Sequence, residues 1–236
     1  MQSSQGTGSE PQALPSHRAE AGSVGSFVDD GNMDVHNGGM SRPSNREKIL
    51  EEGLKVVHER GFASSSVRDI VTAAGVPLGS FSNHFASKDA FGLEIVERYS
   101  THIRSLIGET LRNDAEPPLA RLREYIERGK AKQNCDGGTQ GCLLGNFAAE
   151  TTTASDAIRQ RLNQIFAELT DGVTYCLEAA VSAGEVPADL DCREIGGFIV
   201  SSLQGAMLLC KAERSVAPIE RFQHVLFSVI LRPRRG

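Results

Sequence analysis

One cysteine beside a glycine-rich stretch is the residue in this sequence best placed for covalent chemistry. Residues 135–150 read CDGGTQGCLLGNFAAE, so Cys142 follows small residues and opens an expected helix. A thiol at a helix start lies in the field of unpaired N–H groups, which favours the reactive thiolate form. Most cysteines on apolar helices are inert small hydrophobic side chains, and on position alone that interpretation is favoured.

Other chemistry fits this stretch poorly. A phosphate-binding loop would need a preceding strand and a GK[ST] ending, and neither is present. Zinc is disfavoured because Cys135 and Cys142 have six residues between them, without a CxxC pair or paired histidines. We expect no metal, no cofactor and no catalytic residue. A helical enzyme with Cys142 as nucleophile remains an alternative, although the sequence fixes no general base beside it.

A second short stretch, GSFSNHF at residues 79–85, suits contact with DNA. Phe81 and Phe85 are four residues apart, which places both rings on one face of a helix. A short helix anchored in this way presents its opposite face, and a side with small residues can enter the major groove. The alternative is a helical hairpin that only caps the rest of the protein. The face opposite the rings carries small or polar residues: Gly79, Ser80, Ser82 and Asn83.

Hydrophobic periodicity predicts helices almost throughout, and no segment alternates as a strand would. At the N-terminal end they are expected over 45–60, from Ser66 to about 74, within 77–85, and from Ser87 onward. After Pro117 and Pro118 they are expected at about 119–134, 142–152, 155–184, 191–213 and 217–231. The predicted fold is all-α, with a three-helix head on a long connecting helix and a helical body.

Composition bounds the class of protein and its division into domains. The chain has 236 residues, 39% of them apolar, and a net charge of −5. Residues 1–41 are rich in Gly, Ser, Pro and Asp and are predicted to be a disordered acidic tail. The five scattered cysteines favour a reducing compartment. With no N-terminal leader and no run of roughly 18 apolar residues, we expect a cytoplasmic protein without a membrane partner.

The head resembles a known family. Residues from about 45 to 95 include RGFASSSVRDIVTAAGVPLGSFSNHFASKDAFG, which is similar to the N-terminal domain of TetR-type transcriptional repressors. That family joins a helix-turn-helix to a G-S-F-Y-x-x-F-x-S-K-[DE]-x-[LF] segment. The resemblance implies a DNA-binding domain over 42–91, with the helix-turn-helix at about 66–85, and a ligand-sensing and dimerisation domain over 92–232.

The resemblance also implies which residues of the head touch DNA. One departure matters, because Ser82 stands where the family usually has a tyrosine that touches the phosphate backbone, and His84 is a candidate to replace it. A module that has lost DNA affinity and binds protein instead is therefore a further alternative. The expected DNA-binding residues are Ser65, Ser66, Arg68, Leu78, Gly79, Ser80, Ser82, Asn83, His84 and Lys88.

The segment GCLLGNFAAE resembles the NemR and AcuR subgroup of TetR-type repressors, which respond to electrophiles, acrylate-like compounds or related small molecules. In that subgroup the cysteine matching Cys142 is implicated in sensing. Aromatic residues such as Tyr99 and Tyr125 could wall a pocket, although ordinary core or boundary packing is the favoured interpretation of each. The expected effector-binding residues are Cys142, Asn146, Phe147, Glu150, Tyr99 and Tyr125.

The last two expected helices suggest a homodimer. Small residues along 191–213 permit close helix approach, and residues 217–231 supply bulky apolar side chains. The alternative is packing within one chain. We predict a homodimeric repressor on a palindromic operator in double-stranded DNA, with its two heads about one DNA turn apart. A small molecule or electrophile bound at the C-terminal domain is expected to release it.

Overall fold

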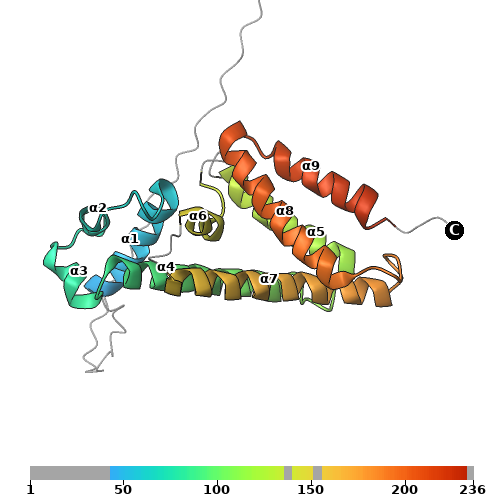
Figure 1. Ribbon diagram of the computed structural model, residues 1–236, viewed down its shortest axis with the longest axis horizontal. Helices are drawn as coiled ribbons and strands as arrows, with labels where there is room; N and C mark the ends of the chain where they lie inside the picture. The colour runs from blue at the N-terminus through green and yellow to red at the C-terminus, as the bar shows by residue number, and fades with distance from the viewer. Residues whose placement is uncertain (1–42, 136–139, 151–155, 233–236) are drawn as a thin grey trace, which may run out of the picture. The chain divides into compact units, whose positions relative to one another are not determined.

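The computed structural model describes residues 43–135, 140–150 and 156–232. These residues form helices and no strand, with a helix-turn-helix head followed by a helical C-terminal region, so the all-α prediction is confirmed. The predicted tail at 1–41 and Cys135's side chain lie outside what is described. Figure 1 shows the order of the helices along the chain.

The head is built from α1 (Asn45–Arg60), α2 (Val67–Ala73) and α3 (Gly79–His84). Ser44 caps α1 by accepting a hydrogen bond from the amide of Glu47. Ser66 and Asp69 form the predicted capping box at the start of α2. The third helix begins at Gly79, two residues after Pro77. Local sequence signals therefore fix where the first two helices begin.

Helix α4 (Lys88–Glu109) follows Ser87, whose side chain accepts from the amide of Ala90, and leads from the head into the body. The body contains α5 (Pro118–Cys135), α6 (Leu143–Glu150), α7 (Asp156–Ser182), α8 (Cys192–Glu213) and α9 (Ala217–Val225). The final helix expected over 217–231 changes character at Leu226, where a π-helical turn, η2 (Leu226–Ile230), begins.

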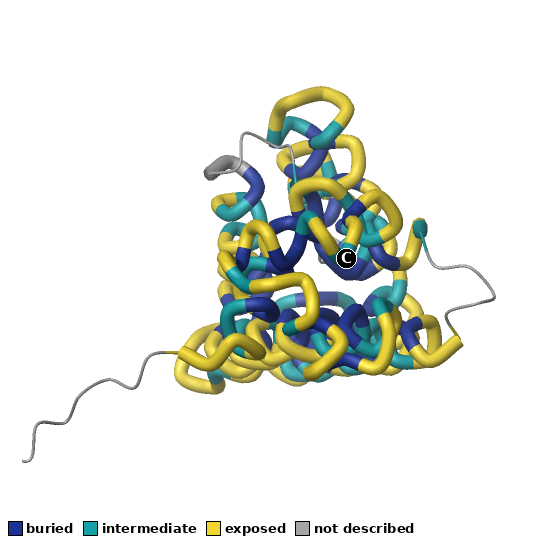
Figure 2. The backbone as a smooth tube through the Cα atoms, turned by 90° about the vertical axis from the view of Figure 1, so that its left-hand side faces the viewer, coloured by how far each residue is buried: buried dark blue, intermediate teal, exposed yellow. Residues whose placement is uncertain are grey.

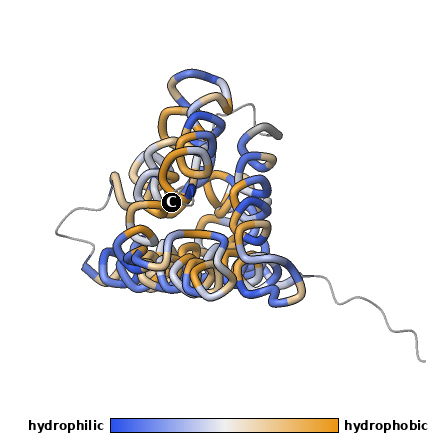
Figure 3. The backbone as a smooth tube through the Cα atoms, turned by 90° about the vertical axis from the view of Figure 1, so that its right-hand side faces the viewer, coloured by the Kyte–Doolittle hydropathy of each residue, from blue (hydrophilic) through white to orange (hydrophobic). Residues whose placement is uncertain are grey.

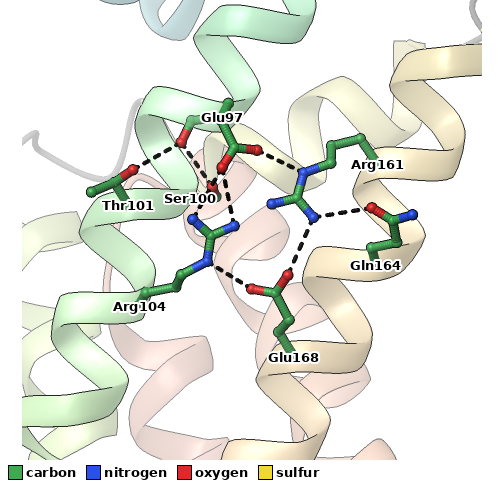
Figure 4. Close-up of polar contacts among 7 residues, drawn as sticks. All are labelled: Glu97, Ser100, Thr101, Arg104, Arg161, Gln164 and Glu168. Atoms are coloured by element: carbon green, nitrogen blue, oxygen red, sulfur yellow. Dashed lines mark hydrogen bonds and ion pairs between the residues drawn. The ribbon is translucent and has the colours of Figure 1, made fainter.

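Charged residues join α4 to α7 along their shared length. Glu97 accepts from Arg161 Nε at 2.7 Å, and Arg104 Nε donates to Glu168 at 2.9 Å. Two pairs within single helices, Arg104 with Glu97 on α4 and Arg161 with Glu168 on α7, close the cluster (Figure 4). These arginines lower the pKa of Glu97 to about 2. The connecting helix is therefore tied to the body by a network rather than by one pair.

The buried side chains form one continuous cluster that runs from the head into the body. Figure 2 shows buried segments where the helices meet and exposed segments along their outer faces. Phe91 of α4 and Phe147 of α6 are among the largest fully buried side chains. The head is thus packed on the same core as the body.

Helix α8 has an unusual amount of exposed apolar surface. Within the described residues it alone is long and apolar enough to cross a membrane by length and composition, and 28% of that window is buried. Core helices of soluble proteins satisfy the same criterion. Figure 3 shows hydrophobic colour on the turns beside the C-terminal label. The exposed apolar side chains on α8, α9 and η2 include Phe198, Leu208, Leu209, Val225 and Val229.

Candidate functional site

Helix α3 is held by its two aromatic rings. Phe81 and Phe85 are 5% and 3% exposed, and their ring centroids lie 5.5 and 5.2 Å from that of Phe91. On the other side Gly79, Ser82 and Asn83 are exposed and Ser80 is half-buried. A Cβ placed on Gly79 would meet no atom within 4 Å. The helix therefore presents a polar surface made of short side chains, which a DNA backbone can approach closely.

Several polar and basic side chains surround this surface. Ser66 and Arg68 are exposed at the start of α2, and Arg68 forms no ion pair with another described residue. Leu78 is 52% exposed beside the start of α3, and His84 is exposed at its end. Lys88 is half-buried, because its ammonium group donates to the carbonyl of Ala63 at 3.2 Å and covers the ring of Phe62.

Ser65 is a correction among the expected DNA-binding residues. Its side chain is fully buried, and its hydroxyl donates to the carbonyl of Gly61 at 2.6 Å. This bond stabilises the turn between α1 and α2, where Gly61 adopts a positive φ of 90°. Sequence alone cannot separate Ser65 from its exposed neighbours because all three serines of the run have the same local chemistry. The Ser65 side chain therefore stabilises this turn and is not accessible at the surface.

A cavity of about 650 Å³ lies between α1 of the head and the helices of the body, beside the loop before α6. It is lined by side chains from α1, α4, α5, α7 and α8, together with Cys142 and Leu144. Most of the wall is apolar. The apolar lining comprises Leu54, Ile103, Leu106, Leu144, Leu169, Leu203 and Met207. The volume falls in the range of ordinary small-molecule pockets.

Three of the expected effector-binding residues line this cavity: Cys142, Tyr99 and Tyr125. Burial raises the pKa of Tyr99 well above its usual range, and the neighbouring Cys142 thiol raises it further. Burial acts on Tyr125 in the same direction. Both phenols are therefore neutral near pH 7 and can donate hydrogen bonds. The ammonium of Lys132 donates to the Tyr99 hydroxyl at 3.2 Å and lies 4.6 Å from its ring centroid.

The other three expected effector residues are not in the cavity wall, which corrects that part of the prediction. The Asn146 amide is held between the carbonyl of Gln140 at 2.8 Å and the ammonium of Lys211 at 3.1 Å. Phe147 and Glu150 face the head. Cys142 precedes the first residue of α6, so helical spacing counted from Cys142 does not predict which side chains enter the cavity.

Helix α6 instead connects the cavity to the head through three contacts. His58 Nε2 of α1 donates to the carbonyl of Gly141, next to Cys142, at 2.9 Å. The ring of Phe147 stacks on Phe62 with centroids 4.9 Å apart.

At the end of α6, the amide of Ala63 donates to a carboxylate oxygen of Glu150 at 2.7 Å. The other oxygen of this carboxylate lies against Gly61, where a Cβ would collide with it. The turn between α1 and α2 is thus seated on the helix that begins at the cavity cysteine.

Sequence reasoning missed two polar residues in the cavity, Gln133 of α5 and Gln204 of α8. Both have a fully buried side-chain oxygen that has no hydrogen-bond partner within the described part of the chain. Tyr125, Gly129 and Gln133 are each four residues apart on one face of α5, which is a signal that could have found the first glutamine. Among the described residues, no group of three or more His, Cys, Asp or Glu side chains could hold a metal ion.

Both parts of the chain match known families. Residues 49–95 match a family described as "Bacterial regulatory proteins, tetR family", and residues 118–226 match "Tetracyclin repressor-like, C-terminal domain". One relative is the HTH-type transcriptional repressor DhaR of Mycobacterium sp. strain GP1. It is 36% identical over 192 residues, which cover 81% of this chain and 95% of DhaR.

Further relatives and solved structures agree. The transcriptional regulator AcuR of Cereibacter sphaeroides is 30% identical over 75% of this chain and 80% of its own length. A crystal structure of a regulatory protein TetR from Rhodobacter sphaeroides superposes with a TM-score of 0.74 and 28% identity, covering 78% of this chain and 97% of that one. The crystal structure of the reduced form of Escherichia coli NemR superposes with a TM-score of 0.70 and 25% identity, covering 77% of this chain and 94% of that one.

Proposed function

Because the chain belongs to the TetR family of DNA-binding transcriptional regulators, we propose that it is a cytoplasmic homodimeric repressor released from a palindromic operator by a small molecule at the Cys142 cavity. The family and its relatives are regulators and not enzymes, so the alternative of a cysteine-dependent enzyme is set aside. The observation that carries the proposal is α6, which begins at the cavity and ends against the head.

In this proposal the DNA contact is made by α3 and the start of α2. Ser80, Ser82 and Asn83 face the groove, with Asn83 able to pair with an adenine edge. Arg68 is available for phosphate because it is exposed and without an ion pair in the described part of the chain. Ser66 contributes less, because its hydroxyl already caps α2.

The proposed dimer contact is the exposed apolar face of α8, α9 and η2. Phe198, Leu208 and Leu209 on α8 are 45%, 61% and 49% exposed, and Val229 is 68% exposed. Exposed apolar side chains in this number on adjacent helices are typical of an interface. A second copy related by a two-fold axis would cover them and would place two heads on one operator.

The proposed effectors include electrophiles such as enals. The sulfur of Cys142 would form a bond to the β-carbon of the enal, and the proton lost by the thiol would end on the α-carbon, so that the product is a saturated thioether aldehyde. The apolar cavity wall accommodates the carbon skeleton. A relative, Escherichia coli NemR, has been solved in a form described as reduced.

Release of the operator would then follow from the contacts between α6 and the head. A group added to Cys142 displaces the start of α6 and the carbonyl of Gly141, which His58 holds. Because the same helix carries Phe147 and Glu150, its displacement shifts the turn that precedes α2. Coupling of this kind requires only that the effector and the operator favour different positions of one element.

An operator-shift assay tests this proposal. We expect a DNA fragment from the gene's own flanks to be retained by the untreated protein and released after treatment with cinnamaldehyde, with one adduct on Cys142 by mass spectrometry. The variant Cys142→Ser should retain the fragment and resist release. Equal release from this variant would refute the thiol role. Retention of no flanking fragment would count against repression and favour a module that binds protein.

A further inference from the structure

Two glutamines that line the cavity each carry a buried hydrogen-bond acceptor without a partner among the described residues. Gln133 is 2% exposed, and its Oε1 has no partner within the described residues. The Oε1 of Gln204 is likewise buried without a partner. An unsatisfied buried polar atom is costly and uncommon, and one explanation is a missing ligand. Both side chains line the same cavity, from α5 and from α8.

Gln204 is close to the cysteine that begins α6. A Cβ on Gly145 would lie 2.9 Å from Gln204 Oε1 and 3.8 Å from Cys142 Cβ. The unpaired oxygen and the cysteine therefore border the same small volume. A ligand that satisfies this oxygen would also touch the helix that is seated on the head.

From these acceptors we infer that the cavity binds an apolar molecule that carries a hydrogen-bond donor, such as a hydroxyl or a primary amide. The inference rests on the proposed function of the cavity as the effector site, and it holds for ligands that do not react with Cys142. The aliphatic side chains of the wall contact the apolar part of the ligand. The donor pairs with Gln133 or Gln204.

An ionised carboxylic acid fits this site less well. A carboxylate has no hydrogen to donate, so it cannot pair with either glutamine oxygen in the orientation that the structure shows. Both arginines of the wall are already paired, Arg98 with Glu47 and Arg128 with Glu109, and the Lys132 ammonium donates to the Tyr99 hydroxyl. An ether or ester of the same size has the same deficiency as the carboxylate. A hydroxyl both donates and accepts, so it also suits the two neutral phenols.

Isothermal titration calorimetry with four compounds on one carbon skeleton tests the inference on the full-length protein without DNA. Cinnamyl alcohol and cinnamamide carry donors, whereas cinnamyl methyl ether and cinnamate do not. We expect the two donors to bind at least about tenfold more tightly than the other two. Equal or tighter binding of the ether or cinnamate would overturn the inference, and so would binding of none of the four.

Variants assign the effect to the glutamines. In Gln133→Leu and Gln204→Met, we expect the preference for cinnamyl alcohol over its methyl ether to fall to about twofold or less. If Gln133→Leu does not fold because position 133 is deeply buried, Gln204→Met alone tests the assignment. Gln164→Leu, at an exposed position on α7 outside the cavity, should keep the full preference. An unchanged preference in Gln204→Met and in a folded Gln133→Leu would overturn the assignment.

The result is distinguishable from a failure of the proposed function. Donor-selective binding together with unaltered operator affinity would leave the ligand class intact and would refute release. If an enal releases the operator but the cavity shows no preference for hydrogen-bond donors, the proposed function stands and the ligand class is refuted.

Discussion

Replacement of Gly79 by leucine separates DNA binding from folding. In the free protein this position has open space, since a Cβ would meet no atom within 4 Å, and its φ is not in the left-handed region. Leucine is also a better helix former than glycine, by up to about 1 kcal/mol. We therefore expect Gly79→Leu to fold with an unchanged or slightly raised melting temperature.

On the operator the same substitution should be costly. A leucine projects four carbon atoms from the surface that α3 presents, which holds Ser82 and Asn83 away from the DNA. Loss of two or three polar contacts at about 1 kcal/mol each weakens binding by roughly 30- to 150-fold. Fluorescence anisotropy on the retained flanking fragment at fixed salt measures this, because phosphate contacts make the affinity salt-dependent.

Gly108 provides the matched control. It lies near the end of α4, is exposed, and also has open space around its missing side chain. Gly108→Leu should bind the operator as tightly as the unaltered protein. Operator affinity of Gly79→Leu within about twofold of this control would refute the assignment of α3 as the groove-entering helix.

Three further predictions concern the dimer, the ion-pair cluster and α6. Phe198→Glu should produce monomers in analytical ultracentrifugation and weaken operator binding at least tenfold, because it places a charge in an apolar contact. Glu97→Gln should lower the melting temperature at pH 7, and the difference should vanish as the pH falls from 4.5 toward 2. The arginines around Glu97 hold its pKa at about 2 in the folded protein, against 4.5 ordinarily, so its stabilisation requires the ionised form. Because Glu97 is about half exposed, solvent screening leaves an effect of about 1 kcal/mol. Glu150→Gln should keep operator binding and reduce the release caused by cinnamaldehyde several-fold, since its bond to Ala63 loses its charge.

Each of these has an opposing outcome. Dimers at micromolar concentration in Phe198→Glu would place the interface elsewhere. A melting-temperature difference for Glu97→Gln that persists at pH 2 would show that shape and not charge is responsible. Full release from Glu150→Gln, matching the exposed-site control Glu220→Gln, would show that the contact between α6 and the head does not transmit the signal.

Local patterns in the sequence are sufficient to predict the start of α2 and the buried face of α3 in the head. The capping box at Ser66 and the two phenylalanines four residues apart act over a few residues, so their structural consequences can be predicted from neighbours alone. The burial of Ser65 could not be predicted in this way, because its acceptor, the carbonyl of Gly61, depends on the path of the turn. Helix existence was likewise predictable, whereas the π-helical turn at Leu226 has no local signal.

The residues that line the cavity cannot be predicted from local patterns in the same way. Cys142, Tyr99 and Tyr125 were suggested by chemistry and resemblance, but the walls come from segments that meet only in the folded chain. Phe147 and Glu150 were assigned to the effector because they follow Cys142. Their partners, Phe62 and Ala63, are more than eighty residues away in sequence. Periodicity tells which residues share a face but not which element that face meets.

The most direct test of the central claim, that α6 carries the effector signal to the head, is hydrogen exchange at the amide of Ala63. This amide donates to Glu150 in the effector-free protein. After complete modification of Cys142 by cinnamaldehyde, we predict that it exchanges about tenfold faster, in parallel with loss of operator affinity. Unchanged exchange at Ala63 in a modified protein that has released its operator would contradict the claim.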